Sequence, residues 1–302
     1  MSKLIVALVA ASMLSACAED KVIGPEGDID GGKVIDSGVI ADGGPPVDAP
    51  PGTPPCSMTG VWIAAQVTFS TALGAQQKAV NWYYHDITQT GDDFTITKSL
   101  DCGFRVTGTT TVTLKEPTME ALAKRSSSVG RKGTFKPSAS GNTCDFTLGR
   151  AYSLRGANMA TFLTSQWMVG DPDKALTSFP ALPGNAAAGM EDWDNDGKEG
   201  FTLVTGLGER YVAQRDWASY AGTVPQQSLM FGGPELVVTW DGQEAVSQQT
   251  AALLRTGSTP TNPGRVYFAR VDNELTVVTG ANAELETCKN VQRLVLAKFP
   301  NP

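Results

Sequence analysis

The chain has 302 residues, of which 41% are hydrophobic, and 24 Lys and Arg against 31 Asp and Glu give a net charge of -7. This composition is too apolar for a disordered protein and too evenly apolar for a protein with many membrane spans. Eight of the acids and only two lysines fall within residues 18–55, so residues 56–302 are nearly neutral. A nearly neutral domain has no field that would attract a polyanion, which argues against a nucleic-acid partner.

The first segment has the pattern of an export signal. Lys3 precedes an apolar run, Leu4 to Leu14, that is too short to cross a bilayer. The run ends in Leu-Ser-Ala followed by Cys17, which resembles the lipobox of bacterial lipoproteins, where small residues admit a peptidase and the thiol is lipidated.

This resemblance implies that residues 1–16 are a lipoprotein signal peptide and that Cys17 is the lipid attachment site. It also implies a lipid-anchored protein of the cell envelope. Ala18 follows the cysteine in place of an Asp retention signal, which favours the outer membrane. The alternative is an ordinary secretory signal, with Cys17 in a disulfide.

Residues 18–55 are rich in Gly, Asp and Pro and contain almost no aromatic side chains. Such a segment cannot bury enough apolar surface to offset its ordering entropy. Together with the lipidated cysteine it is predicted to form a disordered tether, residues 17–55, that leads to a β-rich domain at residues 56–302.

Most of this domain reads as strands. The predicted strands are Gly60–Phe69, Asn81–Thr88, Phe94–Thr97, Phe104–Leu114, Leu236–Trp240, Arg265–Val271 and Leu275–Val278. Asp241-Gly242 predicts a hairpin turn after Trp240, and Asn262-Pro263-Gly264 precedes the strand predicted from Arg265. Helical spacing predicts helices over Glu116–Lys124 and Ala283–Phe299.

The prolines between residues 165 and 198 indicate an irregular stretch that could divide the domain into two halves. Period-two alternation elsewhere is typical of antiparallel sheets with one dry face.

Thr59-Gly60-Val61-Trp62 resembles the Gly-x-Trp start of lipocalins and avidins, where the Trp closes one end of the barrel. With the lipobox and the tether, the chain resembles bacterial lipoproteins that carry a lipocalin-like β domain. The resemblance implies an all-β, antiparallel lipocalin-like barrel or sandwich with a short C-terminal helix. It implies no particular activity.

Four cysteines remain after lipidation, and in an oxidising compartment they predict two disulfides with three possible pairings. Cys102 ends one predicted strand and Cys144 begins another, so a Cys102–Cys144 bridge across the sheets is favoured. Cys56 and Cys288 would then join the start of the domain to its last helix.

Residues 192–200 match the first half of a calcium loop. Asp192, Asp194 and Asp196 would supply carboxylates, Gly197 the sharp turn and Lys198 its carbonyl. The twelfth position lacks the bidentate Glu of an EF-hand, so the loop predicts weak calcium binding, with a Kd on the order of 10⁻⁴–10⁻³ M. The alternative is an exposed acidic turn with no ion.

No catalytic site is predicted. His85 is followed by Asp86, but neighbours on a strand point to opposite faces, so Asp86 would not orient His85. No Gly-x-Ser-x-Gly motif supplies a nucleophile.

The leading interpretation is therefore a non-enzymatic protein that binds a small apolar ligand or an envelope partner. One alternative is a hydrolase acting on envelope polymers through a carboxylate pair. The other is a structural surface protein.

Overall fold

The structure is a computed structural model of the chain, and it describes residues 56–302 apart from several gaps. The gaps are residues 73–74, 109–110, 127–129, 140, 158–189, 207, 227 and 250–251. The predicted signal peptide, Cys17 and the predicted tether lie outside the described residues. Most of the stretch that was predicted to divide the domain also lies outside them.

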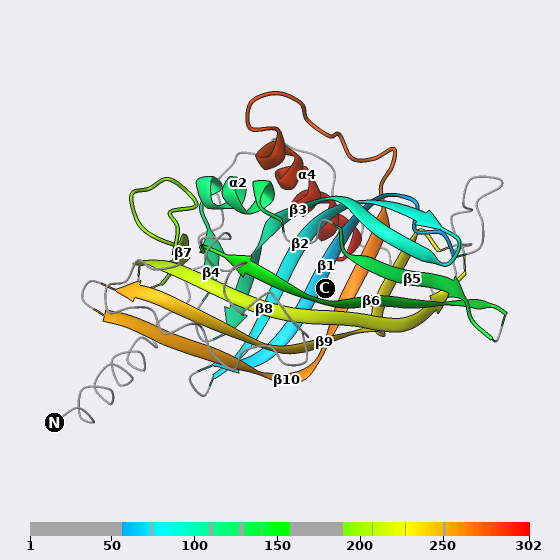
Figure 1. The fold of residues 1–302 in the computed structure, drawn as a ribbon, viewed down its shortest axis with the longest axis horizontal. Coiled ribbons are helices and arrows are strands. Elements are labelled where there is room, and N and C mark those ends of the chain that lie inside the picture. The colour runs from blue at the N-terminus through cyan, green and yellow to red at the C-terminus, as the bar shows by residue number, and fades with distance from the viewer. Residues whose placement is uncertain are drawn as a thin grey trace, which may run out of the picture. The chain divides into compact units, whose positions relative to one another are not determined.

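The described elements are ten strands and two helices (Figure 1). In chain order they are β1 (Gly60–Ala72), β2 (Ala75–Thr90), β3 (Asp93–Gly108), β4 (Val112–Leu114), α2 (Glu116–Lys124), β5 (Lys132–Pro137), β6 (Thr143–Arg155), β7 (Phe201–Thr205), β8 (Gly208–Pro225), β9 (Met230–Gln249), β10 (Ala252–Arg270) and α4 (Ala283–Lys298).

Eight of these strands form a closed antiparallel barrel. Each of β1, β2, β3, β5, β6, β8, β9 and β10 pairs with the next, and β10 pairs with β1. The order of the strands around the barrel follows the chain, as in a meander, although β4 and α2 lie between β3 and β5 and β7 lies between β6 and β8. The predicted lipocalin-like all-β fold is confirmed, as a barrel rather than a sandwich.

The barrel wall is split between β3 and β8. On one side of the split, the start of β3 pairs with β5, β5 pairs with β6, and β6 pairs with the C-terminal part of β8. The end of β3 pairs with β4, and β4 pairs with β7, which pairs with the start of β8. The helix α2 connects β4 to β5 and packs against β3, so it lies beside this split.

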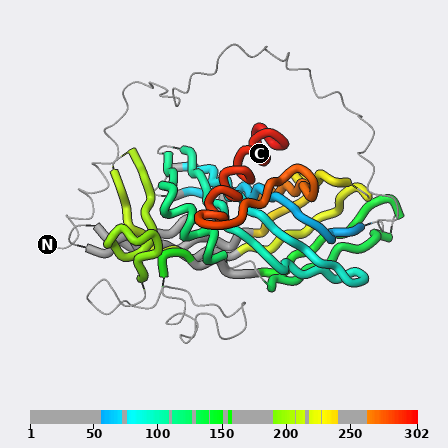
Figure 2. Tube along the Cα trace, turned by 90° about the horizontal axis from the view of Figure 1, so that it is seen from above, coloured from blue at the N-terminus to red at the C-terminus, as the bar shows by residue number. Residues whose placement is uncertain are grey.

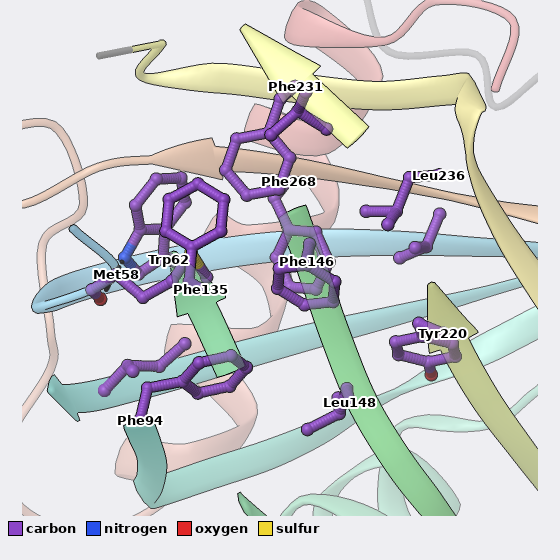
Figure 3. Close-up of a cluster of buried hydrophobic side chains, with 14 of the residues drawn as sticks. Met58, Trp62, Phe94, Phe135, Phe146, Leu148, Tyr220, Phe231, Leu236 and Phe268 are labelled. Atoms are coloured by element: carbon purple, nitrogen blue, oxygen red, sulfur yellow. Dashed lines mark hydrogen bonds between the residues drawn. The ribbon is translucent and has the colours of Figure 1, made fainter. Parts of the chain in front are cut away.

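One end of the barrel is filled by aromatic side chains, which contact one another in pairs with ring centroids about 5.4–6.5 Å apart. Figure 3 shows this cluster, which contains Trp62, Phe135, Phe146, Phe231 and Phe268. The indole of Trp62 is 1% exposed and donates to the carbonyl of Met58 over 2.8 Å. Trp62 therefore closes this end of the barrel, as the Gly-x-Trp motif predicts.

The helix α4 packs on the outer face of the barrel (Figures 1 and 2). Its buried residues Leu285, Cys288, Val291 and Val295 recur at helical spacing and meet apolar residues of β1, β2 and β3. Both predicted helices are confirmed. A 3.6-residue period of apolar residues places them on one face of a helix, which can then be buried.

The two predicted disulfides are confirmed, but the favoured pairing is wrong. The structure pairs Cys56 with Cys144 and Cys102 with Cys288. Cys102 follows the inward Asp101, so it points to the outer face of β3, where α4 lies. Cys144 lies in the core cluster inside the barrel, so Cys102 cannot reach it.

Two local predictions are wrong, the turn at Asp241-Gly242 and the strand at Leu275–Val278, and the strand predicted from Arg265 begins earlier. Asp241-Gly242 lies within β9, and Asn262-Pro263-Gly264 lies within β10 beside a register irregularity. Residues 243–249 extend β9 because they pair with both β8 and β10. Leu275–Val278 is not a strand, since α4 side chains bond its backbone and the buried Leu275 packs in the outer cluster.

Candidate functional site

The interior of the barrel changes character along β1. Trp62 and Ala64 face the aromatic end, whereas the next inward residues are Gln66, Thr68 and Ser70. The cross-strand partner of Gln66 on β2 is Asn81, and that of Ser70 is Gln77. Since paired residues share a face of the sheet, the inward side of both strands is polar at this end.

A hydrogen-bonded layer separates the two ends. The side-chain oxygen Oε1 of Gln66 accepts hydrogen bonds from the hydroxyl of Tyr220 over 2.9 Å and from that of Tyr83 over 3.3 Å. These tyrosines reach Gln66 from β8 and β2, so three strands meet in this layer. Buried hydroxyl groups need such partners, because an unpaired one costs about 1–3 kcal/mol.

His85 lies in the same region, 4% exposed, with Nδ1 3.0 Å from Oγ of Ser99. Its ring stacks on that of Tyr83 at 5.6 Å between centroids. Burial, and secondarily the positive charge of Arg131, lower the pKa of His85 to about 3. His85 is therefore uncharged near neutral pH and is a very weak base, and strand alternation places Asp86 on the opposite face.

Beyond this layer a buried ion pair crosses the interior. Arg155, from the end of β6, is 2% exposed and binds Asp101 of β3 with Nη2 2.8 Å from Oδ2. The guanidinium carbon of Arg155 lies 5.1 Å from the centroid of the Phe104 ring. Asn81 adds a longer contact, with Oδ1 3.4 Å from Nη2 of Arg155.

A bulge in β3 brings Asp101 and Phe104 to the same guanidinium. Asn81 and Tyr83, two residues apart on β2, pair with Phe104 and Asp101, three residues apart on β3. The extra residue lets two positions of opposite parity both face inward. Gly103 within the bulge has φ +85°, a conformation that L side chains rarely adopt.

These side chains surround a cavity of about 40 Å³ at the polar end of the barrel. On the scale of ~10–15 Å³ for each water molecule it holds about three. Its described lining is mostly amide and hydroxyl groups, with three apolar side chains and one arginine. The lining residues are Gln66, Thr68, Ser70, Gln77, Ala79, Asn81, Phe104, Val106, Arg155 and Gln214.

The predicted metal residues lie at a second place, on the loop before β7. One carboxylate oxygen from each of Asp192, Asp194 and Asp196 lies within 4.8 Å of the others, so the structure brings the predicted cluster together. Gly197 has φ +82°, which fits its predicted place in the sharp turn. The backbone N–H of Lys198 donates to Oδ1 of Asp196 over 2.8 Å.

Sequence reasoning missed the residues of the polar cavity. A signal for part of the set exists in β1, because extending the alternation from Trp62 places Gln66, Thr68 and Ser70 on the inward face. The pairing of Arg155 with Asp101 has no such signal, since 54 residues separate them.

Comparisons with protein-family models, with curated proteins and with solved structures found no match to this chain. Among the residues that the structure describes, no helix is both long enough and apolar enough to cross a membrane.

Proposed function

We propose that this protein is a lipid-anchored binding protein of the cell envelope that is not an enzyme. It takes part of a small, uncharged polar ligand, such as one edge of a saccharide unit, into the polar end of its barrel. The proposal rests on one observation, the polar cavity at one end of a barrel whose other end is filled by aromatic side chains. Its anchoring part rests on the sequence around Cys17.

The burial of polar groups at this end supports a binding role. Gln66, Asn81, Arg155 and Gln214 are each 2–9% exposed. Burying amide and charged groups costs free energy unless they are hydrogen-bonded. A barrel that served only as a scaffold could fill this end with apolar side chains, as it does around Trp62.

The lining favours a neutral ligand rich in hydroxyl groups. Side-chain amides both donate and accept hydrogen bonds, and the hydroxyls of Thr68 and Ser70 do the same. Arg155, the one charged residue of the described lining, is already paired with Asp101, so an anionic ligand gains little there. The Phe104 ring adds an apolar surface against which the carbon face of a sugar ring can pack.

The alternatives have less support from the described residues. A drug-sized apolar ligand needs a pocket of about 300–1,000 Å³, whereas this cavity has about 40 Å³. No described lining residue carries a carboxylate, so nothing there favours a hydrolase with a carboxylate pair. Met230, Val237, Val277 and Leu296, the described large apolar residues that are exposed, give no specific support for an envelope protein partner.

The test uses the full-length chain purified from membranes. Small molecules released on denaturation are identified by mass spectrometry, and binding of neutral saccharides is measured by saturation-transfer NMR. We expect a neutral polar ligand whose affinity falls at least about tenfold in Ala79→Leu, because the added side chain fills the cavity.

Gln76→Leu is the matched control, because Gln76 is exposed on the opposite face of β2 and the variant introduces the same residue there. Ligand release from wild type and Gln76→Leu, but not from Ala79→Leu, supports the proposal. Recovery of an apolar lipid, or binding that Ala79→Leu leaves intact, would overturn it.

A further inference from the structure

We infer that the loop Asp192–Gly200 is a calcium site and that calcium binding there stabilises the split in the barrel wall. This goes beyond the proposed ligand-binding function, which involves a different part of the barrel. Three carboxylates gather there, with one oxygen of each within 4.8 Å of the others. An acidic cluster alone is not a metal site, so the inference depends on how its most buried member is bonded.

Asp194 is 9% exposed, and its two oxygens are in different situations. Oδ2 accepts hydrogen bonds from Oγ1 of Thr118 over 2.6 Å and from the backbone N–H of Thr202 over 2.9 Å. Oδ1 is buried and has no hydrogen-bond partner. A buried carboxylate oxygen without a donor is costly, and a cation is the partner that such an oxygen lacks.

The same loop contains a second buried oxygen in this state. Oε2 of Glu199 is also buried without a partner. Among the described residues, these are the two carboxylate oxygens found in that situation, and five residues separate them in sequence. Of the two residues, Asp194 belongs to the carboxylate cluster, so a cation held there would supply the partner that its Oδ1 lacks.

The chemistry of the donor set selects a hard cation. All the candidate ligands are oxygens, from Asp192, Asp194 and Asp196, with the carbonyl of Lys198 at the position that calcium loops use. A loop of flexible side chains with several carboxylates suits the six to eight ligands of calcium better than the strict octahedron of magnesium.

The neighbours of Asp194 give the site its structural effect. Thr118 belongs to α2 and Thr202 to β7, so Asp194 joins both elements where β4 and β7 bridge the split between β3 and β8. Trp193 of the same loop packs with Leu122 of α2 and Phe201 of β7 in one buried cluster. A cation that fixes the loop therefore also fixes α2 and β7.

The test compares chelator-treated full-length protein with and without calcium at matched ionic strength. At roughly 10 mM calcium, above a Kd on the order of 10⁻⁴–10⁻³ M, the melting temperature should rise by about 3–8 °C. Magnesium should raise it less. Terbium, used as a calcium probe, should luminesce on tryptophan excitation, because Trp193 lies within the loop. Hydrogen exchange should slow in α2 and β7.

Asp192→Asn/Asp196→Asn should abolish the calcium shift and the terbium signal while leaving Asp194 bonded to Thr118 and Thr202. Asp92→Asn/Asp93→Asn is the matched control, since it removes the same charge from an exposed turn elsewhere and should keep both signals. Absence of both signals in the wild type would overturn the inference. A thermal shift that persists in the loop variant, or that magnesium equals, would also overturn it.

Discussion

Asp101 and Arg155 form an ion pair inside the barrel, with both Nε and Nη2 of Arg155 within 3 Å of Oδ2 of Asp101. Their side chains are 7% and 2% exposed. The other oxygen of Asp101 accepts the backbone N–H of Gly103 over 3.1 Å. The pair links β3 to β6 across the interior, and Arg155 also lines the polar cavity, so Asp101 holds in place a residue of the proposed binding site.

Removing one partner of this pair should destabilise the fold strongly. We expect Arg155→Met or Asp101→Asn to lower the free energy of unfolding by about 3–5 kcal/mol, because the remaining group is left buried without its partner. The double variant Arg155→Met/Asp101→Asn should lose less than the sum of the single losses. Urea denaturation in a double-mutant cycle measures this.

The exposed ion pairs of Lys289 with Glu116 and Glu286 provide the control, and Lys289→Met should cost under about 1 kcal/mol. Additive losses at Asp101 and Arg155 would show that the two side chains do not interact in solution.

His85 should make stability depend on pH. Its pKa is about 3 in the folded state and 6.5 in the reference state, mainly because burial disfavours the charged ring. Between these two pKa values the unfolded chain binds a proton that the folded chain does not. The contribution of uncharged His85 to the free energy of unfolding is therefore complete above pH 6.5 and is lost as the pH falls toward 3. The slope should be about 1 kcal/mol per pH unit.

His85→Gln should remove that slope while the carboxylate contributions remain. Chemical denaturation at a series of pH values between 4 and 7 compares the two proteins, within the roughly three-unit window set by this shift. Parallel stability curves for wild type and His85→Gln would contradict a buried, uncharged histidine.

Non-reducing peptide mapping should find Cys56 joined to Cys144 and Cys102 joined to Cys288. Replacing either pair by serine should lower the free energy of unfolding by about 2–5 kcal/mol, since each bridge closes a long stretch of chain. Recovery of a Cys102–Cys144 peptide would show that the structural pairing is wrong.

Cys17→Ser should release the protein from membranes, because the proposed lipid is attached to that thiol. Several acyl chains anchor a protein stably, so the wild type should remain in the membrane fraction after a salt wash. Fractionation with mass spectrometry of the N-terminal peptide measures this. An acylated Cys17→Ser protein would contradict the lipoprotein assignment, and Ser15→Thr is the control that keeps the thiol.

Much of the barrel could be read from local patterns. Alternation over Gly60–Phe69 and helical spacing over Ala283–Phe299 report which side of an element is dry, and that side is a property of a few consecutive residues. The role of Trp62 in closing one barrel end also followed from a short motif at the start of the first strand. The number of disulfides followed from the number of cysteines and the oxidising compartment that was expected.

Partners distant in the sequence were decided only by the tertiary structure. Cys102 meets Cys288 because strand alternation turns it outward under α4, and Asp101 meets Arg155 because a bulge in β3 sets the inward register. Asp241-Gly242 lies at a register irregularity inside β9 and does not end the strand, because the residues that follow pair with both β8 and β10. Local sequence sets the free energy of each element, whereas closing the barrel sets which elements become neighbours, and pairings across the interior exist only after that closure.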